Sequence, residues 1–149
     1  MRILTGVLTV FFLASAAFAA NTRVRHSGGE IKYGEFLKVQ GTEDVRADAL
    51  KLKPMTREGD RPIEASASVD LRNLLDEELF VTFAIVLLDG EGNVVACGTE
   101  TPMNESYRYD KVRHGIDRKE GLVVTVFLGL VDISSAKTYK VTVTTSPVK

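Results

Sequence analysis

The most regular hydrophobic pattern in the chain lies in residues 79–88. Large apolar side chains recur there at every second position, from Leu79 to Leu87, and the residues between them are smaller or more mixed. Alternation with a period of two is typical of a β-strand that buries one face. Residues 89–93 contain two glycines, which suit the positive φ angles of a tight turn. We therefore predict a hairpin in which residues 94–99 return beside the first strand.

Further strands are predicted from shorter patterns of the same kind. In one of them Leu50 and Leu52 share a face, with Lys51 and Lys53 on the other. Another is apolar on both faces, which predicts a central and buried strand. The predicted segments are residues 30–41 (with a bulge or bend at Gly34), 46–55, 63–73, 122–131 (apolar on both faces) and 137–145.

These segments give seven or eight short strands, with turn residues between them and no sustained helical period. This is the pattern of an antiparallel β-sandwich, and it predicts an all-β fold. Residues 100–121 leave two alternatives open: a strand over residues 106–112, or a short helix that ends at Gly115.

The first residues have the pattern of a secretory signal peptide. Arg2 precedes an almost wholly apolar stretch, and Ala17 and Ala19 form a small-x-small cleavage site. We expect a signal peptide at 1–19, a flexible leader at 20–29 and a single β-sandwich domain at 30–149. The protein is then exported, to the periplasm or outside the cell, and we expect no membrane-spanning segment in the mature chain.

The charge balance argues against nucleic acid as a partner. The whole chain has 19 basic and 20 acidic residues, and removing the signal peptide takes away one arginine. A general nucleic-acid binder would carry a clear basic excess. The single cysteine, Cys97, has no partner for an internal disulfide, so we expect it to be a small buried side chain within a strand. The alternative is an exposed thiol that links two copies during export.

One stretch resembles a known family. It contains Val-Asp-Leu-Arg-Asn at 69–73, a short acidic link, and then Val-Thr-Phe-Ala-Ile-Val-Leu-Leu-Asp-Gly-Glu-Gly-Asn-Val-Val at 81–95. Residues 65–100 resemble the immunoglobulin-like domains of exported bacterial proteins. The resemblance implies an immunoglobulin-like or fibronectin-III-like sandwich with a binding or spacer role, and it implies no catalytic residue.

No set of residues predicts catalysis, a cofactor or a metal centre. His26 and His114 lie far apart in the sequence, and Ser66, Ser134 and Ser135 lack the context of a catalytic nucleophile. Residues 89–93 carry alternating oxygen ligands that would suit calcium. That loop is shorter than a known calcium-binding loop, however, and turn chemistry explains each of its residues.

A group of cations beside two tyrosines is the most suggestive feature. Its members are Tyr107, Arg108, Tyr109, Lys111, Arg113, Arg118 and Lys119. They predict a contact surface for an anionic partner. The alternative is a solvated loop in which Asp110, Asp117 and Glu120 balance the positive charge.

Together these patterns predict an exported, non-catalytic binding module whose partner is another protein or a surface polymer. A small enzyme whose site is assembled only in the fold is one alternative. A carbohydrate-binding domain is another; the chain has no tryptophan with which to build a sugar platform.

Overall fold

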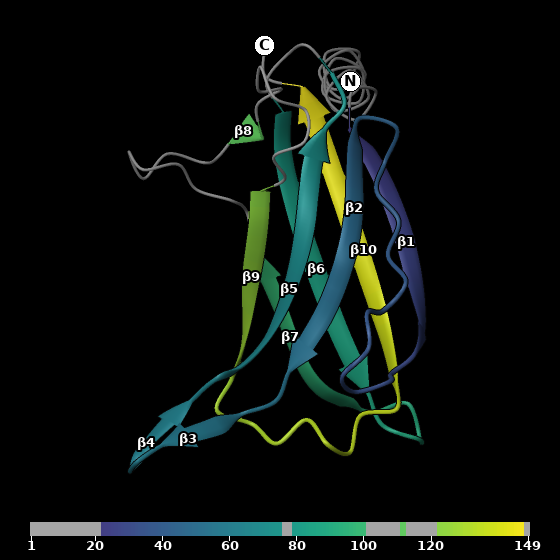
Figure 1. Ribbon diagram of the computed structural model, residues 1–149. Coiled ribbons are helices and arrows are strands. Elements are labelled where there is room, and N and C mark those ends of the chain that lie inside the picture. Colours follow the sequence, from purple (N-terminus) through teal and green to yellow (C-terminus); the bar gives the residue numbers. More distant parts are fainter. Residues whose placement is uncertain (1–21, 76–78, 101–110, 113–121, 148–149) are drawn as a thin grey trace, which may run out of the picture.

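The computed structural model describes residues 22–75, 79–100, 111–112 and 122–147, and within these ranges the protein is all-β (Figure 1). All the strand pairs are antiparallel. The strands are β1 (Arg23–Glu30), β2 (Val45–Lys53), β3 (Thr56–Glu58), β4 (Arg61–Ile63), β5 (Ala65–Asn73), β6 (Leu79–Leu88), β7 (Val94–Glu100), β8 (Lys111–Val112), β9 (Leu122–Gly129) and β10 (Thr138–Pro147).

Two sheets contribute to one hydrophobic core. The larger sheet has the order β1-β10-β6-β7, and β8 also pairs with β6; the smaller sheet has the order β2-β5-β9. Figure 1 shows them as two layers, and one cluster of buried side chains draws on both. The short strands β3 and β4 form a separate hairpin that projects from one end of the molecule (Figure 1).

The hydrophobic alternation in β6 is confirmed. Leu79, Val81, Phe83, Ile85 and Leu87 are at most 1% exposed and form the centre of the core. Strand β6 lies between β10 and β7, so its backbone is paired on both sides. The predicted hairpin to β7 is also present, and its turn contains a glycine with a positive φ angle. The position of β6 explains why its pattern is so regular.

The patterns in β2, β5 and β10 are confirmed as well. Buried residues occupy alternate positions of β5 and β10, and Leu50 and Leu52 of β2 point to the core while Lys51 and Lys53 are exposed. For these three strands the apolar period predicted both the element and its buried face.

Strand β9, predicted to be central and buried, is an edge strand of the smaller sheet. Val124, Val126 and Leu128 face the core, whereas Val123 and Phe127 are 63% exposed. The prediction was wrong because an apolar residue on the outer face has the same sequence signature whether or not another layer covers it.

Strands β7 and β9, in different sheets, approach each other closely on one side of the core. A Cβ atom added to Gly98 of β7 would lie 2.6 Å from Cγ1 of Val126 and 2.8 Å from the carbonyl oxygen of Phe127. Only glycine fits this approach without a displacement. The small residue therefore allows the two sheets to converge at this edge.

Residues 20–29, expected to be a flexible leader, contain strand β1 instead. The strand pairs with β10 from Arg23 to Glu30, and none of its side chains is buried. Backbone hydrogen bonds and polar contacts hold it, so it lacks the apolar alternation that would have revealed it. The extended stretch predicted at 30–41 is largely irregular: only Leu37 makes a β-bridge there, to Leu50, and Gly34 has a φ angle of 85°.

The burial of β6 predicts a clear contrast between two neighbouring substitutions. Phe83 is 0% exposed, so Phe83→Ala should lower the free energy of unfolding by about 3–5 kcal/mol. Thr82 points to the other face of the same strand and is partly exposed, so Thr82→Ala should cost about 1 kcal/mol or less. Urea denaturation of the two variants measures both values. Equal and small losses would contradict the assigned faces.

Candidate functional site

A β-bulge in β2 sets the geometry of the candidate site. Buried residues occupy odd positions before the bulge (Val45, Ala47) and even positions after it (Leu50, Leu52). The register with β5 shifts at this point, where two residues of β2 stand opposite one residue of β5. Ala49 lies in the bulge and has a φ angle of 53°, in the left-handed region that non-glycine residues rarely adopt.

After the bulge, two lysines point to the outer face of the smaller sheet. Lys51 pairs with Ser68 of β5, and Lys53 pairs with Ser66. On the other side of β5, Ser66 pairs with Phe127 of β9. Serine is much shorter than lysine or phenylalanine, so the longer side chains of the two neighbouring strands flank it. Ser66 is only 9% exposed although it faces outward.

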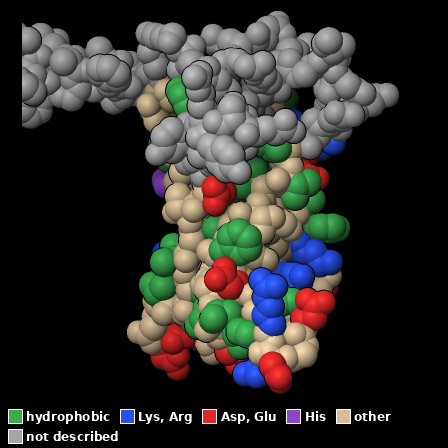
Figure 2. Space-filling view, turned by 90° about the vertical axis from the view of Figure 1, so that its left-hand side faces the viewer, with side chains coloured by type: hydrophobic (Ala, Val, Ile, Leu, Met, Phe, Trp, Pro, Cys, Tyr) green, Lys and Arg blue, Asp and Glu red, His purple; other side chains and the backbone are tan. Residues whose placement is uncertain are grey.

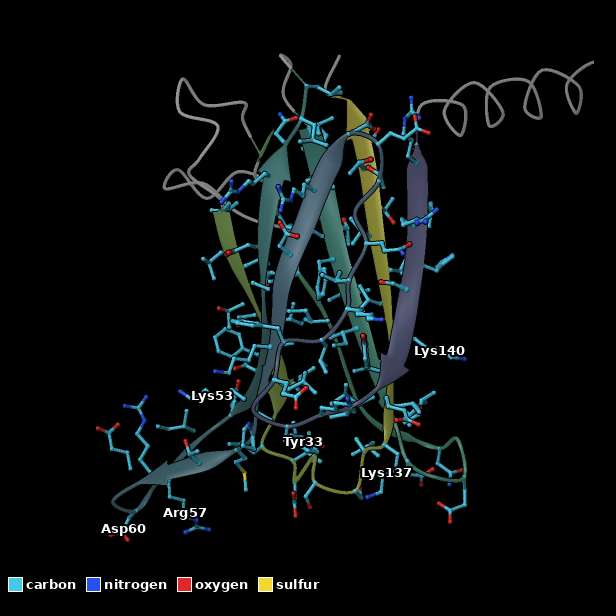
Figure 3. The ribbon with its side chains drawn as sticks, turned by 45° about the vertical axis from the view of Figure 1, so that its right-hand side comes forward. Tyr33, Lys53, Arg57, Asp60, Lys137 and Lys140 are labelled. Atoms are coloured by element: carbon cyan, nitrogen blue, oxygen red, sulfur yellow. The ribbon has the colours of Figure 1, made fainter. Side chains whose placement is uncertain are left out.

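Beside the end of β2 lies a cavity of about 660 Å³, which we call the lysine pocket. Small-ligand pockets generally fall in a range of about 300–1,000 Å³. Figure 3 shows Tyr33 and Lys53 at the end of the molecule from which the β3–β4 hairpin projects. The lining residues are Tyr33, Gly34, Lys51, Leu52, Lys53, Pro54, Ser68 and Ser134.

Tyr33 forms a fixed wall of the lysine pocket. Its hydroxyl donates a hydrogen bond to the carbonyl oxygen of Ile133, which follows β9, and its side chain remains partly exposed. Burial raises the pKa of Tyr33, and the nearby charge of Asp132 raises it further, so the phenol stays neutral. The Asp132 carboxylate itself accepts a hydrogen bond of 2.9 Å from the backbone N–H of Ser134.

The two lysines give the pocket local positive charge. Among the described residues neither Lys51 nor Lys53 forms an ion pair, whereas Arg46 and Asp48, before the bulge, pair at 2.5 Å. The ammonium of Lys51 lies 5.8 Å from the centroid of the Phe36 ring, a contact that contributes about 0.5–1 kcal/mol at an exposed site. The ring positions this lysine but does not neutralise it.

The surrounding surface carries both signs of charge. Figure 2 shows Lys and Arg side chains gathered on the lower part of one face, with acidic and hydrophobic side chains close to them. The pocket combines two ammonium groups, two serine hydroxyls and a tyrosine ring, and this set can hold an anion that also has hydroxyl groups or an apolar face.

The sequence-predicted contact surface falls almost wholly outside the described residues. Tyr107, Arg108, Tyr109, Arg113, Arg118 and Lys119 are not described. Lys111 is described only through its backbone, in β8, where it pairs with Phe80 of β6. The prediction of an anionic contact at these residues stays a prediction.

Asp89 stabilises the β6–β7 turn with both carboxylate oxygens. Oδ1 accepts hydrogen bonds from the backbone N–H groups of Glu91 and Asn93, and Oδ2 accepts one from the side-chain amide of Asn93. The bond from the Asn93 side chain is the largest of the causes that lower the pKa of Asp89. In the described part of the chain no cluster of three or more His, Cys, Asp or Glu residues could hold a metal ion.

Cys97 is exposed, and the expectation that it would be buried was wrong. In β7 the core-facing positions include Ala96 and the closely packed Gly98, so Cys97 between them points outward. His26 is also exposed, with Nδ1 3.0 Å from the hydroxyl of Thr142 on β10. Cys97 and His26 are in opposite edge strands of the larger sheet, so the structure does not bring them together.

Sequence reasoning missed the lysine pocket although it identified the face on which the pocket lies. Lys51 and Lys53 were recognised as the polar side of a strand, which is normally just a solvated surface. Their partners in the pocket, Tyr33 and Ser134, come from distant parts of the sequence. The available signal was the alternation of two lysines with two leucines, and it says nothing about which loops lie beside them.

No protein-family model and no curated protein matches this sequence. Among matching solved structures, the trimeric lipoprotein SadB of Salmonella enterica is 12% identical to this chain, with a TM-score of 0.34. That alignment covers 94% of this chain and 72% of SadB. The likeness is too low to carry an argument about fold or function. No helix in the described ranges is long and apolar enough to cross a bilayer.

The bulge predicts opposite responses to two substitutions of Ala49. Valine is strongly disfavoured at a positive φ angle. Glycine adopts this angle without strain, and its one cost is the larger conformational entropy that it loses on folding. The free energy of unfolding of Ala49→Val should therefore be about 1–2 kcal/mol lower than that of Ala49→Gly. Urea denaturation of the two variants measures the difference. Equal stability would mean that Ala49 does not adopt the left-handed conformation in solution.

The exposure of Cys97 predicts a reactive thiol in the folded protein. A water-soluble aromatic disulfide reagent should label Cys97 without denaturant, because the sulfur is accessible from solvent. The rate should rise only modestly when urea is added. Cys97→Ser serves as the blank. Labelling that begins only on unfolding would show that the side chain is covered.

Proposed function

We propose that this protein is an exported, non-catalytic binding module with an immunoglobulin-like sandwich, and that the lysine pocket holds part of an acidic surface polysaccharide. The observation that carries the proposal is the pocket: Lys51 and Lys53 point into a cavity of about 660 Å³ and form no ion pair with any described residue. The apolar stretch and the small-x-small site at the start of the sequence support export.

The strand order supports the immunoglobulin-like part of the proposal. In a variable-type immunoglobulin domain one sheet contains strands A, B and E, and the other has the order G, F, C, C′. The smaller sheet here, β2-β5-β9, corresponds to A, B and E, and β10-β6-β7 correspond to F, C and C′. The fourth position, that of strand G, is occupied by β1, which comes first in this chain and not last.

The chemistry of the pocket suits an acidic saccharide. The residues that line the pocket supply ammonium groups for carboxylates, hydroxyls for hydroxyls, and a ring for the apolar face of a sugar.

Exposed aromatic rings supply the platform that the absence of tryptophan had argued against. Phe36 is 68% exposed and Phe127 is 63% exposed, and Tyr33 is partly exposed in the pocket wall. Phe36 contacts Lys51, and Phe127 pairs across β5 toward Lys53. Large rings of this kind contribute area and a flat face to binding, so charge and platform lie on one face of the smaller sheet.

The proposal predicts that the two lysines carry the binding of a defined acidic polymer. Polygalacturonate is a suitable probe, with dextran as the uncharged comparison. The double variant Lys51→Gln with Lys53→Gln should weaken binding of polygalacturonate at least about tenfold, because each lysine loses a charge-assisted hydrogen bond. Raising the salt concentration should likewise weaken the binding of polygalacturonate to the wild-type protein, because salt screens the attraction between charges. Isothermal titration calorimetry measures both effects.

The matched control removes the same charge elsewhere. Lys137 and Lys140 are exposed and lie outside the pocket (Figure 3), so their double glutamine variant should bind as the wild type does. A melting curve shows whether each variant is folded. If the control loses as much affinity as the pocket variant, or if dextran binds equally well, the pocket is not the site of an acidic polysaccharide. Binding of a cell-surface protein that the pocket variant abolishes would instead favour a protein partner.

A further inference from the structure

No side chain of strand β1 is anchored in the hydrophobic core. It pairs with β10 along its whole length, from Arg23 opposite Thr145 to Glu30 opposite Thr138. None of its side chains is buried, although it occupies a position in the larger sheet next to the core-lining strand β10. Moving β1 away therefore removes no side chain of its own from the core, but Ile31, which follows β1 and packs partly buried against the core, moves with it and regains this contact if β1 pairs with another copy of the chain.

The side of β1 that faces the smaller sheet makes polar contacts with residues 40–44. Arg23 forms ion pairs with Glu43 and, through Nε at 3.2 Å, with Asp44. Further along, Arg25 donates a hydrogen bond of 2.8 Å to the side chain of Gln40. These contacts are directional and complementary in charge, so they specify the place of β1 without fixing which copy of the chain supplies it.

A short exposed connection separates β1 from the part of the chain that it contacts. Ile31 is hydrogen-bonded to Lys137, and Leu37 is hydrogen-bonded to Leu50. The residues between these two anchors, 32–36, are all exposed, and Gly34 among them has a φ angle of 85°. Rotation in this segment would carry β1 away as a unit and leave Leu37 and everything after it in place.

We propose that β1 is exchanged between two copies of this chain, so that β1 of each copy lies beside β10 of the other. Every contact that holds β1 in one copy forms again across the pair, and only residues 32–36 change conformation. Exchange of an identical element is a low-cost route to a dimer because no new interface has to evolve. This proposal does not rest on the lysine pocket being a binding site.

Cysteines placed at a paired position report the exchange directly. Val24 and Thr144 are opposite each other in the β1–β10 ladder, and such pairs lie within the reach of a disulfide. Full-length chains carrying Val24→Cys or Thr144→Cys, both with Cys97→Ser, are mixed at high concentration, incubated and oxidised. Exchange predicts a disulfide-linked dimer that contains one chain of each kind, formed several-fold more than with the mismatched pair Val24→Cys and Lys140→Cys.

Two further variants make each outcome decisive. A single chain with both Val24→Cys and Thr144→Cys, oxidised at a low concentration where the monomer predominates, should form the disulfide internally, which locks β1 in place and should leave only monomer when the protein is then concentrated. Deleting Gly34 and Glu35 shortens the connection and should raise the fraction of dimer at a given concentration, measured by light scattering. If the internal disulfide forms but the mixed dimer does not exceed the mismatched pair, β1 is not exchanged. If neither disulfide forms, the pairing on which the proposal rests is absent in solution.

Discussion

A β-strand has only two faces, and the bulge at Ala49 determines which face of β2 carries charge. If the alternation that begins at Val45 continued without interruption, Lys51 and Lys53 would point to the core and two leucines would be exposed. Exposing two leucines would cost about 1.5–3 kcal/mol each, and burying an unpaired ammonium costs more. The left-handed conformation of Ala49 costs about 1–2 kcal/mol. The bulge is the smaller cost, and both the core and the lysine pocket depend on it.

A second constraint is the buried carboxylate of Asp44, which is 4% exposed. Its Oδ2 accepts a hydrogen bond of 3.0 Å from the hydroxyl of Thr145 on β10, and it also pairs with Arg23 of β1. Its backbone carbonyl accepts a hydrogen bond from Leu74, just after β5. A buried charge is tolerated only where it is paired and hydrogen-bonded. The same residue therefore ties both sheets and the edge strand β1 together at one end of the molecule.

The apolar period predicted the strands whose outer faces are polar, and it failed where that contrast is missing. Strands β5, β6 and β10 combine a buried face with a more polar one, and each was predicted. Strand β1 has no buried face at all, and β9 carries apolar residues on both, so β1 was missed and β9 was placed in the centre of a sheet instead of at its edge. The lysine pocket was beyond prediction because Tyr33 and Ser134 reach it through the three-dimensional fold alone.

The pocket and the edge strand share residues 32–36, which couples them. Tyr33 and Gly34 line the lysine pocket, and the same two residues lie in the connection that must change conformation if β1 leaves its own copy. The hydrogen bond from the Tyr33 hydroxyl to Ile133 holds this connection in its present path. A ligand that contacts both Tyr33 and the two lysines binds more tightly when Tyr33 is in its present position in the pocket wall than when residues 32–36 have changed conformation. By linkage, such a ligand shifts the population toward the arrangement it binds, so occupation of the pocket and movement of β1 oppose each other.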